Sequence, residues 1–215
     1  MTGTTFGALV TQNNGNIRKA LKGGVLTAPT TASLPTALTA GSPPALQALT
    51  GFSSMGFFDS TGAVISEKLT VQDVEAWGKT SPVRTDIELD VTSVKVVALE
   101  TNAAVLAARF GVSSITPNET TGEVVITSNI SPVPAFQRVL VLSQDGPAGG
   151  EWWVGKLLPY ASVTAIGDES WNSAKSTMTA TLTFTGYEDP VAGFACQTFY
   201  AGPGWLAGLA GAGLS

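Results

Sequence analysis

The stretch "KSTMTATLTFTGYEDP", residues 175–190, indicates the fold class more clearly than any other part of the chain. Threonine recurs at every second position from 177 to 185, and the positions between hold Met, Ala, Leu and Phe. Successive side chains of a β-strand point to opposite faces. The alternation therefore predicts a half-buried antiparallel strand with an uncharged polar face.

Similar patterns recur along the chain between short turn signals. The sequence Asp-Ser-Thr-Gly at 59–62 predicts the turn of a hairpin. In 68–77 and 83–97 the apolar positions change phase, which indicates a bulge or a switch of face, because the side-chain period of a strand is two. Further strands are predicted at 22–29, 122–128, 136–144, 151–166, 175–187 and 193–200. We therefore predict a mainly β fold, a β-sandwich or partly closed barrel, with one packed α-helix.

The helix is predicted from "LETNAAVLAARFG", residues 99–111, where apolar residues recur at spacings of four, three and four. Thr101 or Asn102 can cap its start, and Gly111 suits the left-handed residue after its end. A short helix rich in Ala is marginal alone, so we expect it to pack on the sheet.

The composition predicts a single domain that associates with other copies or proteins. We divide the 215 residues into an N-terminal arm, 1–20, and one β-sandwich domain, 21–215, which includes a long loop at 30–51. Only 13% of residues are charged, against about 25% in ordinary globular proteins. Such a surface exposes uncharged and apolar area, which is typical of an assembly subunit. We expect a neighbouring subunit to hold the arm and the loop in place.

Charge and targeting signals exclude several classes of function. The net charge is −5, and the 11 Lys and Arg residues are dispersed, so sequence-specific DNA binding is not expected. The start of the chain lacks the pattern of a signal peptide, and no segment is long and apolar enough to span a membrane. The single Cys196 excludes an internal disulfide. We expect a soluble, unsecreted protein.

The residues offer little for catalysis. There is no His, and we expect no metal and no cofactor. Cys196 lies among apolar residues and is expected in the core. A glycosidase needs only two carboxylates, and Asp86, Glu88 and Asp90 alternate along one predicted strand. We interpret these acids as one solvated or partner-facing strand face, and predict that the protein is not an enzyme.

Several blocks, in order, resemble the major tail protein, or tail tube protein, of long-tailed phages that infect actinobacteria. The blocks are "NIRKALKGGVLTAPTTASLPT" (16–36), "MGFFDSTGAVISEKLTVQDVEAWG" (55–78), "SPVRTDIELD" (81–90), "ALETN" (98–102) and "AGPGW" (201–205). The resemblance covers nearly the whole chain. It departs from the family at "AAVLAARFGV", which is less polar than the family's usual segment after "ETN".

The resemblance implies a β-sandwich with one helix that assembles into hexameric rings. Strands of each subunit would complete a continuous β-barrel between subunits, and the rings would stack into a tail tube. Genomic DNA would pass through the lumen without specific binding, and the implied protein partners are the tape measure, tail terminator and distal tail proteins. The implied location is the tail tube of the virion, and the host cytoplasm before assembly.

The lumen wall and the contacts between subunits are left open by the sequence. Either the Thr-lined strand at 177–185 or the acidic face at 86–90 can line the lumen. Ring stacking is assigned to the arm and the loop, so deletion of residues 1–20 is expected to prevent polymerisation. The candidate contacts between subunits are Trp77, Arg84, Asp86, Glu88, Glu100, Asn102, Trp153 and Trp205.

Two alternative functions remain open. One is another structural role in the virion, as a capsid decoration protein or a head-to-tail connector. The other is a carbohydrate-binding β-sandwich that uses its Trp residues, among them adjacent Trp152 and Trp153. Adjacent residues of a strand point to opposite faces, so we expect one of these two in the core.

Overall fold

The computed structural model describes residues 5–10, 12–112, 115–127, 133–169, 171 and 177–214. The helical elements are α1 (Phe6–Leu9), η1 (Asn14–Asn16), α2 (Ala103–Phe110), α3 (Pro203–Gly208) and η2 (Ala210–Ala212). The strands are β1 (Lys22–Pro29), β2 (Thr39–Ala40), β3 (Ala45–Leu46), β4 (Ser53–Ser54), β5 (Val64–Val74), β6 (Arg84–Ala98), β7 (Phe136–Asp145), β8 (Trp152–Ile166), β9 (Ala180–Tyr187) and β10 (Gln197–Ala201).

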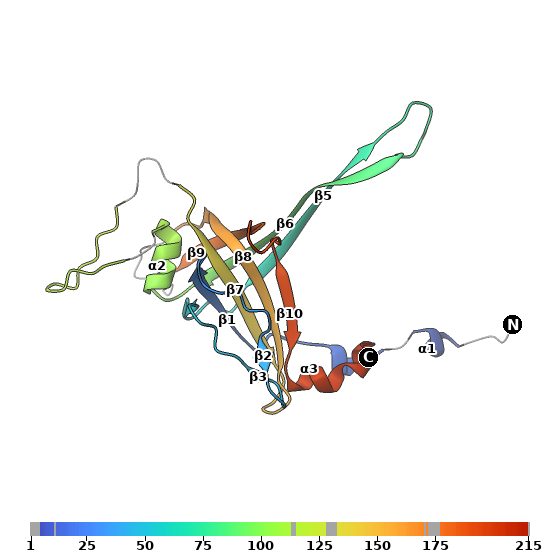
Figure 1. The fold of residues 1–215 in the computed structure, drawn as a ribbon, viewed down its shortest axis with the longest axis horizontal. Coiled ribbons are helices and arrows are strands. Elements are labelled where there is room, and N and C mark those ends of the chain that lie inside the picture. The colour runs from blue at the N-terminus through green and yellow to red at the C-terminus, as the bar shows by residue number, and fades with distance from the viewer. Residues whose placement is uncertain are drawn as a thin grey trace.

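One antiparallel sheet curls into a nearly closed barrel (Figure 1). Its strand order is β4-β1-β7-β8-β9-β6-β5, and β10 pairs with the first half of β8. Segment 53–59 joins the two sides. The Met55 N–H donates to the Val25 carbonyl of β1 at 3.0 Å, and the Asp59 N–H donates to the Val97 carbonyl of β6 at 3.0 Å. The predicted mainly β fold with a partly closed barrel is confirmed.

The core fills the barrel. Its residues come from almost every strand and from α2, and they include Val25, Met55, Val94, Val96, Val105, Val139, Leu158, Leu182 and Phe184. On β9 the apolar residues Leu182 and Phe184 are fully buried, whereas Thr181, Thr183 and Thr185 between them are half-buried. The alternation seen in the sequence therefore places one face of β9 in the core.

Helix α2 forms as the sequence predicts and packs against the barrel. The Asn102 side-chain oxygen accepts a hydrogen bond from the Val105 N–H at 3.0 Å, and Gly111 has a φ of 65°. These are the N-terminal cap and the left-handed residue expected after the helix. Only Val105 and Ala108 are buried on the helix, because eight residues present a narrow apolar face.

The long loop at 30–51 covers the outer face of the chain's own sheet, with β2 and β3 as its short hairpin. Leu38 is 2% exposed and packs with Leu140 and Leu157. A Cβ on Gly155 would lie 2.6 Å from a methyl group of Leu38, so glycine is needed beneath the loop. The expectation that a neighbouring subunit is needed to hold this loop is therefore wrong, because Leu38, Leu34 and Leu49 pack within the chain, although Leu46 is 43% exposed.

Two local predictions are also corrected. The turn at 59–62 forms, with the Gly62 N–H donating to the Asp59 carbonyl at 3.0 Å. It does not connect the strands of a hairpin, because Phe58 before it and Val64 after it both pair with β6. The predicted strand at 122–128 is absent from 122–127, the part that the structure describes, where the side chain of Val125 is 78% exposed. In this described part, the exposed side chain of Val125 does not pack on the sheet.

The root of the N-terminal arm is attached to the body. The Asn16 amide donates to the Gly211 carbonyl at 2.8 Å, and the Lys19 N–H donates to the Asp145 carboxylate at 3.0 Å. The Arg18 guanidinium lies over the Trp152 ring, 3.3 Å from its centroid. Hydrogen bonds from the Lys19 and Gly146 N–H groups lower the pKa of Asp145. Residues 13–21 are therefore part of the body, and the turn α1 before them projects away from it (Figure 1).

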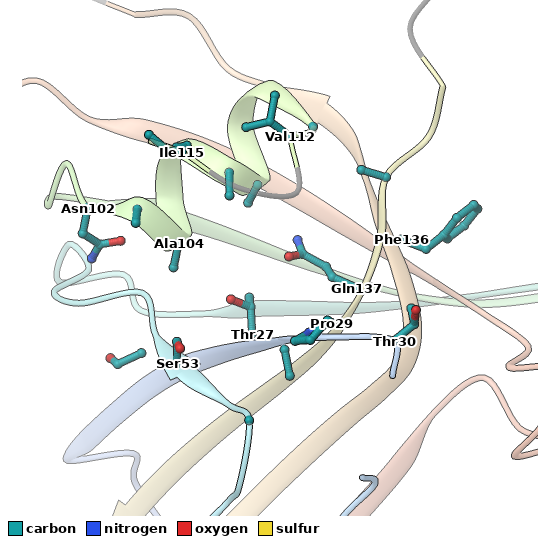
Figure 2. Close-up of a pocket in the computed structure, with 18 of the residues that line it drawn as sticks. Thr27, Pro29, Thr30, Ser53, Asn102, Ala104, Val112, Ile115, Phe136 and Gln137 are labelled. Carbon is teal, nitrogen blue, oxygen red and sulfur yellow. The ribbon is translucent and has the colours of Figure 1, made fainter. Parts of the chain in front are cut away.

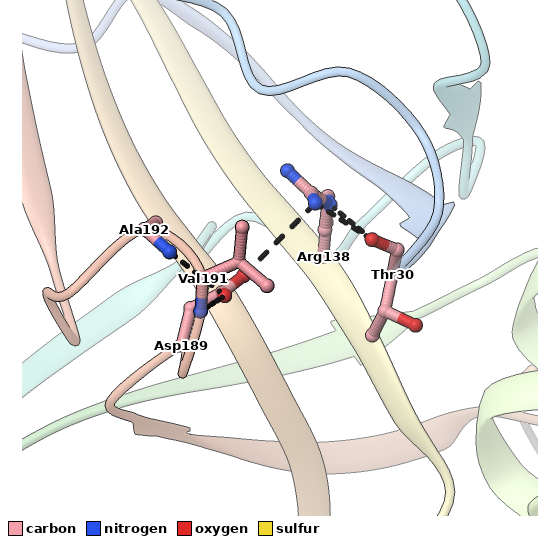
Figure 3. A network of polar contacts seen from close by, with 5 residues as sticks. All are labelled: Thr30, Arg138, Asp189, Val191 and Ala192. Atoms are coloured by element: carbon pink, nitrogen blue, oxygen red, sulfur yellow. Dashed lines mark hydrogen bonds and ion pairs between the residues drawn. The ribbon is translucent and has the colours of Figure 1, made fainter.

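A buried polar network ties three chain segments together (Figure 3). The Arg138 guanidinium on β7 donates twice to the Thr30 carbonyl, at 2.6 and 3.0 Å, and lies 4.0 Å from the Asp189 carboxylate. Asp189 in turn accepts hydrogen bonds from the N–H groups of Ala192 and Val191, which lower its pKa. The network joins the start of the long loop to the turn after β9.

None of the helices in the described part of the chain has the length and the apolar character needed to cross a membrane.

Candidate assembly surface

The β5–β6 hairpin extends far beyond the barrel (Figure 1). Residues 93–98 of β6 pair with β9, but the described part of β6 before Ser93 pairs with β5 alone. Along this distal part, side chains on both faces are exposed, as they are along nearly all of β5. The hairpin is rich in β-branched residues that favour strands, yet nothing in the described chain covers it.

One face of the hairpin continues the core face of the barrel. Leu69 and Val71 on β5 share it with Ile87 on β6, because residues paired directly across a ladder point to the same side. The side chains of these three are 60%, 51% and 68% exposed. On the same face, Thr92 and Glu67 lie between this row and Val94, which is completely buried in the barrel, and Asp90 pairs directly with Leu69. We call the row of Leu69, Val71 and Ile87 the hairpin apolar face.

A bulge changes the arrangement of the acidic residues. Leu89 pairs with Thr70 and Ile87 pairs with Val71, so Glu88 is the extra residue between them. As a result, Asp86 and Asp90 point to opposite faces. The expectation of one acidic face at 86–90 is therefore wrong. The bulge lies between Ile87 and Leu89, ahead of the phase change between Val91 and Val94 that the sequence shows. The bulge carries Ile87 onto the hairpin apolar face.

The hairpin tip presents a large aromatic side chain. Trp77 is fully exposed. Gly78 beside it has a φ of 78°, which a residue with a side chain rarely adopts. The Lys79 N–H donates a hydrogen bond to the Ala76 carbonyl at 3.1 Å, which closes the turn. Behind the tip, Arg84 Nε lies 2.8 Å from an Asp86 oxygen. Both side chains of that pair are largely exposed, so it contributes less than about 1 kcal/mol within the subunit.

The base of the hairpin is fixed by an ion pair. Lys156 on β8 is paired with Glu67 on β5, and this hydrogen bond raises the pKa of Lys156. Near this pair, burial raises the pKa of the Cys196 thiol. Cys196 packs against the main core, as expected. The pair connects the hairpin to a strand on the other side of the barrel mouth.

Glu100 and Asn102 act within the chain. A Glu100 carboxylate oxygen accepts a hydrogen bond from the Phe57 N–H at 2.8 Å, and the Asn102 amide donates to the Met55 carbonyl at 2.9 Å. Both residues therefore hold the segment that closes the barrel. A contact between subunits at these two positions stays a prediction.

The C-terminal aromatic residues form a cluster at the opposite end from α2. Trp152 and Trp153 are both buried, at 9% and 8% exposure, so the expectation that only one of them lies in the core is wrong. Trp205 on α3 packs edge-on against Trp152, with 5.1 Å between ring centroids, and stacks on Tyr200. Trp153 and Trp205 thus have partners within the chain, and their role between subunits is likewise still a prediction.

The polar face of β9 is a second surface of interest. Thr181, Thr183 and Thr185 lie on it, and the hydroxyl of Thr185 is 2.7 Å from that of Thr164. Ser93 and Lys95 pair with this strand from β6. The face is mostly uncharged.

The sequence patterns did not reveal which strands project from the barrel. In 83–91 the apolar residues share one phase and the charged residues the other, which is typical of a strand with one buried face, so the pattern gave no sign that this part projects. The described residues contain no cluster of three or more possible metal ligands. A projecting, two-faced hairpin with an exposed apolar row is typical of a β protein that associates with other chains.

Comparison with known proteins identifies the family. The family model described as "Phage tail tube protein" matches residues 10–192. The match spans most of the chain, so the protein belongs to the phage tail tube protein family, and it is a structural protein of the virion tail rather than an enzyme.

Other comparisons add less. A search of curated proteins finds no match. Among solved structures, one titled "Crystal structure of Hcp protein" is similar at 12% identity with a TM-score of 0.33. The alignment covers 82% of this chain and 97% of that one.

Proposed function

We propose that this protein assembles into hexameric rings that stack to form the tube through which phage DNA is ejected. The six-fold symmetry is inferred from the resemblance to tail tube proteins of long-tailed phages. The observation that carries self-assembly is the β5–β6 hairpin, which projects from a closed barrel with its apolar face uncovered.

The energy available from covering this face is substantial. Complete burial of a Leu, Val or Ile side chain contributes roughly 1.5–3 kcal/mol. Leu69, Val71 and Ile87 are each at least half exposed in the subunit, so contact with a neighbouring subunit would recover part of that free energy at each position. Most of the charged side chains on the hairpin can remain at the rim of such a contact.

The free edges of the hairpin support the same proposal. Within the described chain, the outer edge of β5 has no strand beside it, and neither does the opposite edge of β6 before Ser93. Long, exposed edges of this kind pair readily with other strands. Six hairpins placed side by side around a ring would satisfy their backbone groups in a continuous inner barrel.

For the lumen wall we favour the threonine face of β9. The competing acidic face does not exist as a single surface, because the bulge at Glu88 separates Asp86 from Asp90. A wall of hydroxyl groups with few cations would hold DNA weakly, since tight binding to DNA depends on Lys and Arg. DNA would then slide through without specific contacts.

The exposed tip residues become the proposed contacts with adjacent subunits or rings. Trp77 is the strongest candidate, because an exposed aromatic residue can bury a large area in a partner's pocket. Arg84, Asp86 and Glu88 would form the polar rim around it. The tape measure protein would occupy the lumen, the tail terminator and distal tail proteins would bind the tube ends, and subunits would await assembly in the host cytoplasm.

Electron cryomicroscopy of the purified, concentrated protein tests this function. The expected result is a tube of stacked six-fold rings with an open lumen lined by β9 and the hairpins. Single rings that never stack would favour a head-to-tail connector instead. Monomers that bind oligosaccharides would overturn the proposal in favour of the carbohydrate-binding alternative.

A further inference from the structure

A groove lies between α2 and the adjacent end of the barrel (Figure 2). Its volume is about 920 Å³, near the upper end of the roughly 300–1,000 Å³ of sites that enclose small ligands. The residues that matter here are Ala103, Ala104, Ala107, Thr27, Pro29 and Gln137. We call it the α2 groove.

The groove exists because α2 is short and rich in alanine. Val105 and Ala108 face the core, whereas Ala103, Ala104 and Ala107 project only methyl groups toward the neighbouring strands. Methyl groups leave the space between helix and strands unfilled. None of the described residues that line the groove is charged, so an uncharged segment with apolar side chains suits it.

The segment before the arm root has this chemistry. Residues 1–17 contain no charged side chain. In the described part of the arm, Phe6 is 78% exposed and Leu9 is 71% exposed. The Val10 N–H donates to the Phe6 carbonyl at 2.8 Å, which folds these residues into one turn of helix, α1. The turn offers two large apolar side chains to a receiving surface.

The arm and the groove of one subunit face away from each other. Figure 1 places α1 and α2 at opposite ends of the molecule's long axis. The root is held at the α1 end by Asn16 on the Gly211 carbonyl and by Arg18 on the Trp152 ring. Strand β1 then runs from the root to the groove, where Pro29 contributes to the lining. A second copy of the chain can supply the arm that the groove's own subunit directs elsewhere.

We propose that the α2 groove receives the Phe6–Leu9 turn of a second copy of this chain. Phe6 and Leu9 insert above the alanine face of α2, and the uncharged groove accepts them without burying an unpaired charge. Because arm and groove lie at opposite ends of the subunit, the contact joins successive copies head to tail. The inference thus identifies which surfaces of successive copies meet in the proposed tube, and it rests on that proposed function.

Disulfide trapping between two differently tagged full-length proteins tests the contact. Both carry Cys196→Ala; one also carries Val10→Cys at the end of the turn, which keeps Phe6 and Leu9, and the other Ala107→Cys. A disulfide requires Cα atoms within about 7 Å, so only real contact is trapped. We expect mixed assemblies to give a heterodimer, at about tenfold or more the yield of a control that carries Val191→Cys in place of Ala107→Cys, because contact raises the effective concentration.

The outcomes separate this inference from the proposed function. Tubes without a heterodimer above the Val191 control overturn the arm contact and leave the tube intact. If a protein that carries both cysteines forms the disulfide only within one chain, the arm folds back on its own subunit. That result also overturns the proposed arm contact. Absence of tubes from the unmodified protein contradicts the proposed function itself. Unfolding curves of each variant verify that the subunits are folded.

Discussion

Strand β6 passes through two environments along its length. In its second part, Val94, Val96 and Ala98 are at most 1% exposed and pack in the barrel core. In its first part, Ile87 is 68% exposed and Leu89 is 39% exposed. The same kind of sequence thus builds a dry interior at one end and an uncovered surface at the other. Within a single subunit, the first part of β6 is not covered by other described residues.

This contrast separates residues that stabilise the subunit from residues that join subunits. Substitutions in the barrel should lower the free energy of unfolding whether or not the protein assembles. Substitutions on the hairpin beyond its base, where Glu67 pairs with Lys156, should leave that free energy unchanged and alter assembly alone.

The largest effect on the subunit is expected for Phe184→Ala. Phe184 is fully buried in the barrel, and removal of a buried Phe side chain costs about 3–5 kcal/mol. The matched substitution Ile87→Ala on the hairpin should change stability by no more than about 0.5 kcal/mol. Urea unfolding of unassembled protein measures both. Equal losses would show that the hairpin is packed in the free subunit.

A smaller loss is expected for Arg138→Met. The substitution keeps the apolar stem but removes the two hydrogen bonds to the Thr30 carbonyl and the charge beside Asp189. Hydrogen bonds to charged groups contribute about 1.5–3 kcal/mol, and the loss should fall in that range. Arg84→Met on the exposed hairpin is the control and should be nearly neutral. Similar effects of the two would contradict the distinction between barrel and hairpin.

Acid should weaken the barrel through Asp189. Its pKa in the folded protein is lowered from the ordinary 3.8 by the Ala192 and Val191 N–H groups. The resulting stability is complete above 3.8 and is lost as pH falls through the lower folded value. Asp189→Asn should therefore reduce the slope of stability against pH below 4. Denaturant midpoints from pH 2 to 6 measure it, and an unchanged slope would show that Asp189 does not carry the effect.

The smallest effect is expected at the hairpin base. The pKa of Lys156 is raised from the ordinary 10.5 by its hydrogen bond to Glu67. This stabilisation is present below 10.5 and is lost as pH rises through the higher folded value. Glu67 is largely exposed, so the pair contributes at most about 1 kcal/mol. Glu67→Gln should remove that alkaline loss in unfolding curves, and a larger loss in the variant would contradict this assignment.

Local patterns predicted much of the barrel because each depends on near neighbours in the chain. The alternation at 177–185 located β9, although the strand begins only at Ala180. The cap at Asn102 and the left-handed Gly111 located α2 to within a residue. These signals concern hydrogen bonds and side-chain directions that form over a few residues.

The remaining features depend on pairing and packing between segments that are distant in the sequence. Nothing in the residues around 59–62 shows that both sides of that turn pair with β6. The position of the bulge at Glu88 depends on register with β5, and it decides which acids share a face. Likewise, the Thr- and Pro-rich loop at 30–51 packs through Leu38 onto strands distant in sequence. Such partners cannot be identified from local periodicity.

The most direct test of the central claim combines Leu69→Lys, opposite Asp90, with Ile87→Asp and examines tube formation by electron microscopy. Both changes place charge on the hairpin apolar face, where the free subunit exposes these side chains to water. We predict that the variant remains folded, with an unfolding midpoint equal to that of the unmodified protein, and forms no tubes. Tubes of normal length and diameter from this variant would contradict the assignment of the hairpin as the assembly surface.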